Sequence, residues 1–145
     1  MKKKSGFTLM ELMTAIAIVA ILTAIATPNV IRWLNNSKFN AAAREVHEFI
    51  QDARIKALKE NTSMNVEFDN ANNQYRLTYL NRSTQNTITK PWQQLPPGIT
   101  MNANVATVTM NPRGMANMGT ITIVGPGGNN LQVTVNITGS SRISG

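Results

Sequence analysis

The sequence predicts an α+β protein in which a long N-terminal helix packs on a C-terminal antiparallel β-sheet head. Before Asn61 the apolar residues first form an unbroken run and then recur every three or four positions, which is the period of a helix. Beyond Asn61 they alternate with polar residues, which is the period of a half-buried strand. The change of period marks the boundary between the helix and the head.

The first segment combines a basic stretch, a single acid and an uncharged span. Lys2 to Lys4 precede Gly6 and Phe7, and Glu11 heads an uncharged run of 20 residues from Leu12 to Ile31. A run of this length is sufficient to cross a bilayer core. A carboxylate at its head costs roughly a few kcal/mol in hydrocarbon, so it indicates a function and a cationic partner. The natural partner is a free amine on another copy.

This N-terminal pattern resembles the class III leader of type IV pilins and type II secretion pseudopilins. The resemblance implies that a membrane-embedded prepilin peptidase cuts after Gly6 and methylates the new N-terminal residue, Phe7. It also implies that Glu11 neutralises the N-terminal amine of the neighbouring subunit during assembly. Pro28 stands where pilins kink this helix, in keeping with the loss of a backbone donor.

Two simpler interpretations of the N-terminus stay open. An ordinary secretory signal would use the lysines as its basic region and Ala24 to Ala26 as its cleavage site, so that the mature chain begins at Thr27. A one-pass membrane anchor would use the same span with its basic flank in the cytoplasm. A pilin is itself such an anchor before assembly.

The helix is expected to run from about Thr8 to Glu60. Its second half has one apolar face, formed by Phe39, Ala43, Val46, Ile50, Ala53 and Ala57. The opposite face is charged and consists of Arg44, Glu48, Asp52, Lys56 and Lys59. The apolar face is therefore expected to support the head. His47 lies on this helix and is expected on its polar face or at a contact between subunits.

The head is expected to contain one sheet of about four to six strands. Alternation predicts a hairpin from Met64–Phe68 and Tyr75–Tyr79, joined by an Asp and Asn-rich turn. Tyr75, Leu77 and Tyr79 share its inward face. Three further strands are predicted at Val105–Met110, Gly119–Val124 and Leu131–Ile137, the last with Leu131, Val133, Val135 and Ile137 on one face.

These elements divide the chain into three parts. Residues 1–6 form a cleaved leader, residues 7–31 a transmembrane or filament-core helix, and residues 32–145 a periplasmic or extracellular head. Cysteine is absent from the sequence, so the head has neither a disulfide framework nor a thiolate metal site.

Charge is distributed unevenly. Without the leader, the chain carries 11 basic residues against seven acids. Asp69 is the last acid, and the basic residues beyond it are Arg76, Arg82, Lys90, Arg113 and Arg142. A positive field of this kind attracts phosphates, so DNA is a possible partner, and Arg113 and Arg142 are the candidate anion-binding residues.

The head resembles the GspH/FimT family of minor pilins and pseudopilins. The similar segments are Leu95-Pro96-Pro97-Gly98-Ile99, Asn111-Pro112-Arg113-Gly114, Gly119–Ile123 and Val133–Ile143. Some FimT-like members bind DNA through a Gly-Arg-x-Arg motif. The corresponding stretch here, Gly139-Ser140-Ser141-Arg142, has one of the two arginines.

No pattern in the sequence indicates catalysis. His47 is the only histidine, and no metal-ligand cluster or phosphate-binding glycine motif is present. The sequence therefore predicts a non-enzymatic structural subunit without cofactors, a minor pilin or pseudopilin of a type IV pilus or type II secretion system. Its expected partners are other pilin subunits, prepilin peptidase and the inner membrane. It would cross that membrane once with a periplasmic head before it joins the pilus or pseudopilus. The alternatives are a DNA-binding minor pilin for natural transformation, a filament-forming major pilin and a soluble periplasmic protein.

Overall fold

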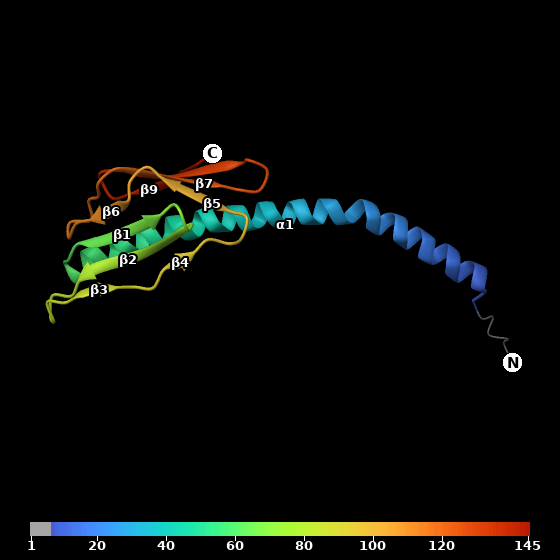
Figure 1. Cartoon of the computed structure of the whole chain (residues 1–145), viewed down its shortest axis with the longest axis horizontal. Coiled ribbons are helices and arrows are strands. Elements are labelled where there is room, and N and C mark those ends of the chain that lie inside the picture. Colours follow the sequence, from blue (N-terminus) through green and yellow to red (C-terminus); the bar gives the residue numbers. More distant parts are fainter. Residues whose placement is uncertain (1–6) are drawn as a thin grey trace. The chain divides into compact units, whose positions relative to one another are not determined.

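The computed structural model describes residues 7–145, which form one helix followed by nine strands (Figure 1). Helix α1 spans Leu9–Glu60. The strands are β1 (Met64–Asp69), β2 (Gln74–Leu80), β3 (Thr87–Thr89), β4 (Gln93–Gln94), β5 (Thr100–Ala103), β6 (Thr107–Met110), β7 (Gly119–Val124), β8 (Asn130–Val135) and β9 (Ser141–Ser144).

The bounds of α1 agree with the sequence prediction. Pro28 lies inside the helix and does not end it, and the kink expected at this residue stays a prediction. The C-terminal end is closed by Asn61, whose φ of 48° is in the left-handed region, and by a hydrogen bond of 3.2 Å from Thr62 N to Ala57 O. This is the Schellman arrangement, in which the backbone beyond the helix satisfies one of its last carbonyls.

The chain separates into two compact units, one ending at Asn35 and the other spanning Asn36–Gly145. All buried apolar side chains of the described residues lie between Phe39 and Val135. The second unit therefore contains a complete core of its own, which is why we expect it to fold in isolation. The α1 residues in this core are Phe39, Ala42, Ala43, Val46, Ile50, Ala53 and Ala57, which confirms the predicted apolar face.

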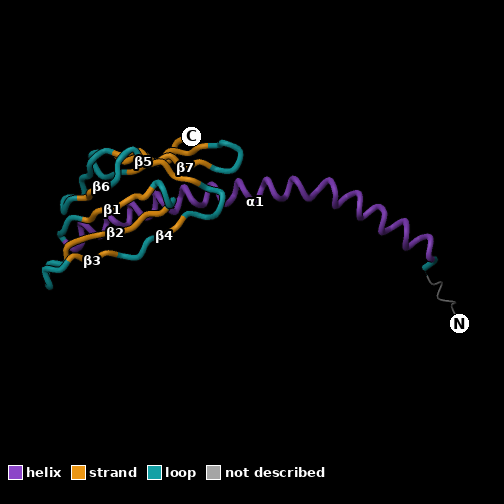
Figure 2. Tube along the Cα trace, viewed as in Figure 1, coloured by secondary structure: helices purple, strands orange, loops and turns teal. Residues whose placement is uncertain are grey.

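The head contains two antiparallel sheets, and the expectation of a single sheet was wrong. The first sheet has the order β3-β2-β1-β6, with β4 also paired to β2, and the second has the order β5-β7-β8-β9. Figure 1 shows both sheets alongside the second half of α1, and the teal loops of Figure 2 connect their strands. The predicted β1–β2 hairpin is confirmed, with Met64 opposite Tyr79 and Phe68 opposite Tyr75.

The last predicted strand ends two residues earlier than expected. Strand β8 stops at Val135, and the next residues form a turn closed by a hydrogen bond of 2.8 Å from Gly139 N to Asn136 O. Gly139 adopts a φ of 72°, which favours glycine. Ile137 was expected to share the inward face of this strand, but it lies in the turn with 57% of its surface exposed. Strand β6 likewise begins at Thr107 rather than Val105.

Tyr75 connects the first sheet to the helix. Its side chain is fully buried, its ring meets Phe49 edge to face at 4.8 Å, and its hydroxyl donates a hydrogen bond of 2.9 Å to Glu45 on α1. Tyr79, predicted to share this inward face, is only partly buried. Burial and the Glu45 carboxylate raise the pKa of Tyr75 well above its ordinary value.

This raised pKa predicts a loss of stability at alkaline pH. The folded head retains the Tyr75 proton where the unfolded chain releases it, so this contribution to stability is complete below about pH 10 and declines as the pH rises further. We expect the free energy of unfolding of residues 36–145 to fall by up to about 1.4 kcal/mol per pH unit above pH 10 through this group. Urea unfolding between pH 8 and about pH 11 measures the slope. Tyr75→Phe should be less stable at pH 8 but should lose less stability on the way to alkaline pH, and an identical slope in both proteins would contradict the assignment.

Candidate functional site

The N-terminus of α1 is closed by a reciprocal pair of side chains. Thr8 Oγ1 accepts a hydrogen bond of 3.2 Å from Glu11 N, while Glu11 Oε2 lies 3.3 Å from both Thr8 N and Thr8 Oγ1. This is a capping box, which satisfies backbone donors that the first helical turn leaves without partners. Glu11 is therefore held at the start of the helix by its own chain. A threonine followed three residues later by a glutamate is the sequence signal for such a cap, and it could have identified Thr8 beside Glu11.

The segment that follows Glu11 exposes its apolar side chains. Residues 7–34 are all exposed, and α1 is the one described helix that is long and apolar enough to cross a membrane by length and composition. Its threonines satisfy their hydroxyls locally. Thr14, Thr23 and Thr27 each donate a hydrogen bond of 2.7 to 2.8 Å to the carbonyl four residues earlier. Such a surface suits lipid or other apolar helices rather than water.

The expected processing site lies at the boundary of the described chain. Gly6 falls outside the described residues. Phe7 is the first of them, and 85% of its surface is exposed. Phe7 immediately precedes Thr8, the first residue of the capping box.

Arg113, one of the candidate anion-binding residues, lies in a tight turn after β6. Asn111 Oδ1 accepts hydrogen bonds of 3.0 Å from Arg113 N and Met115 N, and Gly114 adopts a φ of 77°. The backbone of the turn is therefore fixed, while the Arg113 side chain is exposed.

Arg142 lies on β9, opposite Thr134 of β8, and is exposed. The structure brings its segment close to that of Arg113, because Gly139 packs against the carbonyl of Gly114 with no room for a side chain. The same carbonyl accepts a hydrogen bond of 3.0 Å from Arg54 Nε on α1.

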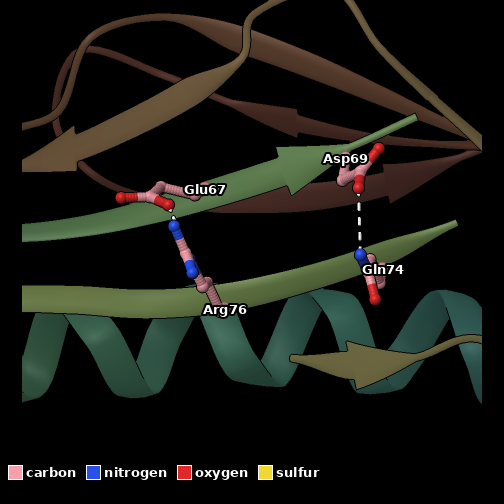
Figure 3. A network of polar contacts seen from close by, with 4 residues as sticks. All are labelled: Glu67, Asp69, Gln74 and Arg76. Carbon is pink, nitrogen blue, oxygen red and sulfur yellow. Dashed lines mark hydrogen bonds and ion pairs between the residues drawn. The ribbon is translucent and has the colours of Figure 1, made fainter. Parts of the chain in front are cut away.

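Two interactions modify the charge pattern seen in the sequence. Arg76 forms an ion pair of 2.7 Å with Glu67 on the neighbouring strand, and its guanidinium lies 4.2 Å from the centre of the Trp92 ring. The positive charge of Arg76 is thus compensated by an acid from the other half of the sequence. Asp69 accepts hydrogen bonds from the side chains of Asn72 and Gln74, which lower its pKa. Figure 3 shows the bond from Gln74 and the Glu67–Arg76 ion pair.

His47 does not lie on an open polar face. It is partly buried, and its Nδ1 lies 2.8 Å from Ser141 Oγ, which also accepts a hydrogen bond of 2.6 Å from Gln51 Nε2. The histidine therefore contacts the last strand of its own head. The described residues contain no cluster of histidines and acids suited to a metal ion.

A long helix with an apolar, exposed first half and a two-sheet head on its second half is the architecture of a type IV pilin-like subunit. Residues 42–140 match the family model described as type II transport protein GspH, and the chain belongs to this family. Residues 1–27 match the prokaryotic N-terminal methylation motif.

Two solved structures share the fold at low sequence identity. One is the minor pseudopilin EpsH from the type 2 secretion system of Vibrio cholerae, with 12% identity and a TM-score of 0.63 over 74% of this chain and 96% of that one. The other is the type IV minor pilin FimU of Pseudomonas aeruginosa, with 13% identity and a TM-score of 0.62 over 78% of this chain and 92% of that one. No curated protein sequence matches this chain significantly. With the family assignment, the chain is a structural subunit of a type II secretion pseudopilus or a type IV pilus.

Proposed function

We propose that this subunit enters the inner membrane through residues 7–31, is cleaved after Gly6 by prepilin peptidase, and is methylated on Phe7. The processed subunit then leaves the membrane by packing its apolar segment among those of its neighbours. Glu11 receives the N-terminal amine of an adjacent subunit in this step. The head does not take part in catalysis.

The placement of Glu11 is the observation that carries this proposal. Its carboxylate projects from the first turn of a helix whose next 20 residues carry no charge. Within residues 7–145 the carboxylate accepts two hydrogen bonds, from Thr8 N and Thr8 Oγ1. Both are 3.3 Å long and both are accepted by Oε2, so Oε1 accepts none. One oxygen thus remains for a charged donor, and a charge-assisted hydrogen bond to an amine is shorter and stronger than the two existing bonds. In an apolar surrounding, an amine from a neighbour would relieve the cost of the unpaired carboxylate.

Removal of this charge is expected to impair assembly but not processing. We expect Glu11→Ala and Glu11→Gln to be cleaved normally, as measured by the mass of the mature chain, but to be depleted from sheared filaments or purified pseudopili. Glu11→Gln retains the length of the side chain and so isolates the role of the charge. Glu48→Ala, which removes an exposed acid from the head portion of α1, serves as the control. Normal incorporation of both Glu11 variants would exclude the charge pair.

A bulky residue at the cleavage site is expected to stop processing. Gly6→Val should leave the leader attached, because a β-branched side chain obstructs access to the peptide bond after residue 6. Mass spectrometry of the membrane-bound protein measures this directly. A mature chain that still begins at Phe7 would contradict the assignment, and one that begins at Thr27 would indicate an ordinary secretory signal instead.

DNA is a second candidate ligand because the two exposed arginines, Arg113 and Arg142, lie on segments that contact each other through Gly114 and Gly139. On this hypothesis the full chain in detergent micelles binds duplex DNA with an affinity that falls steeply with salt. Arg113→Ala and Arg142→Ala should each weaken binding and lower the salt slope by about one. Lys59→Ala is the matched control, because it removes one exposed positive charge from α1 rather than from either arginine segment. Absence of binding at low salt would eliminate DNA as a ligand.

A further inference from the structure

The edges of the two sheets are closed in different ways, and one edge is left open. An edge strand presents backbone N–H and C=O groups that have no strand to bond to, and proteins usually block them. Here the edges are β3 with β4 and β6 in the first sheet, and β5 and β9 in the second.

The edge of β6 is closed by one asparagine. Thr109 N donates a hydrogen bond of 2.7 Å to Asn117 Oδ1, and Asn117 Nδ2 donates one of 3.0 Å to Thr107 O. The Asn117 side chain therefore takes the place of a neighbouring strand.

The edge of β5 is closed in the same manner by the turn between β1 and β2. Ala103 N donates a hydrogen bond of 2.9 Å to Asn70 Oδ1, and Asn70 Nδ2 donates one of 3.0 Å to Ala103 O. Met101 N donates a further bond of 2.8 Å to Asn73 Oδ1. Both amide side chains come from the turn that joins two strands of the first sheet, so they also link the two sheets.

The remaining edge of the first sheet is protected by its shape. Strand β3 has three residues and β4 has two, and Lys90 and Pro91 lie between them. Short strands, lysine and proline are the usual means of preventing an edge from pairing with another chain.

Within residues 7–145, strand β9 has no amide side chain bonded to its edge and no proline. Its bonding pattern identifies the free backbone groups. The turn before it is closed by a bond of 2.9 Å from Asn136 N to Ser140 O. Bonded and non-bonded pairs alternate along an antiparallel ladder, so Arg142 and Ser144 bond to β8, and Ser141 and Ile143 direct their backbone groups outward. In the described part of the chain, no hydrogen bond involves the backbone N–H or C=O of these two residues.

The open edge is also held rigidly. The Ser141 side chain is bonded to His47 and Gln51 of α1, and Ile143 packs against the core. Arg142 points to the opposite face of the strand, where it is exposed, and it has no ion pair within residues 7–145. A strand that is fixed in position needs little further ordering to pair with another.

We propose that the outer edge of β9 is a docking site for an extended segment of a different protein, which adds to the second sheet as a further strand and places a carboxylate beside Arg142. The Ser141 and Ile143 backbone groups supply the main-chain hydrogen bonds, and Arg142 selects the charge of the partner. Apolar side chains of the added strand would lie next to Ile143 on the inner face.

Pairing with a second copy of this chain is disfavoured by charge. The sequence has no acid beyond Asp69, so none of the edge strands β3, β4, β5, β6 and β9 carries a carboxylate. If two copies of β9 paired antiparallel with Ser141 opposite Ile143, the two Arg142 side chains would lie directly opposite each other, which is destabilising. Because the edge strands of this chain offer no carboxylate to Arg142, the complementary strand is expected from another protein.

Two short peptides test the proposal with the full chain in detergent micelles. The peptide Thr-Val-Glu-Val-Thr, blocked at both ends, presents valines on one face and a glutamate on the other, and its lysine analogue differs only in charge. At millimolar concentration we expect the glutamate peptide to shift the Ser141 and Ile143 amide signals in NMR spectra and to slow their exchange with solvent. The lysine peptide should bind roughly tenfold more weakly.

Substitutions on β9 separate the contributions of backbone and charge. Ile143→Pro removes an outward N–H that makes no bond to β8 and should abolish binding, whereas Ile143→Val should retain it. Arg142→Glu should reverse the preference, so that the lysine peptide binds more tightly than the glutamate peptide. This variant leaves the backbone of β9 intact, so it tests the proposal even if the proline variant fails to form the strand. Three results would each overturn the proposal. The first is equal binding of both peptides, the second is a shift of amide signals at β5 or β6 instead of β9, and the third is self-association through β9 without peptide. Glu11→Ala should not alter peptide binding, so failure here leaves the assembly proposal untouched.

Discussion

The apolar face of α1 between Phe39 and Ala57 is the surface on which the whole head depends. Four of its seven buried residues are alanines, which allow the strands to approach the helix closely, while Phe39, Val46 and Ile50 supply most of the apolar area. Both sheets contribute to the core that covers this face. Burial of such area is the main favourable term in folding, and the Tyr75–Glu45 hydrogen bond adds a directional contact to it. Among the described residues none covers the first half of the same helix, so we expect its stability to come from its surroundings.

The helix and the hairpin could be predicted from the sequence because each depends on a local period. Spacings of three to four residues and of two residues remain visible without knowledge of the fold, as in Val46 to Ile50 or in Met64 to Phe68. The division into two sheets could not be predicted, because β5 and β9 are four-residue strands whose pairing is set by contacts far along the chain. Ile137 fits the alternation of apolar residues in β8, but the strand ends at Val135 because residues 136–139 form a hydrogen-bonded turn.

The candidate site was predictable to a similar extent. Glu11 could be recognised because a lone acid in an uncharged run conflicts with the apolar surroundings that the run requires. The position of His47 could not, since a helical period cannot indicate that Ser141, 94 residues away, contacts its ring. Nor could the role of the asparagines. Their abundance suggests a neutral polar surface, but Asn70, Asn73 and Asn117 act as substitutes for missing strands.

Within residues 7–145 the protein therefore has two surfaces that no other described residue covers, and their chemistry differs. In the N-terminal segment it is the side chains that lack partners. The helix bonds its own backbone, while its apolar residues and the Glu11 carboxylate are exposed. On β9 it is the backbone N–H and C=O groups of Ser141 and Ile143 that lack partners. The side chains of these two residues contact α1 or the core, and that of Arg142 is exposed to solvent. Apolar helices can exchange lipid for one another with little directional constraint, whereas a strand edge accepts only a segment in register. A subunit with both surfaces can be held in a filament by the first and can select a specific neighbour by the second.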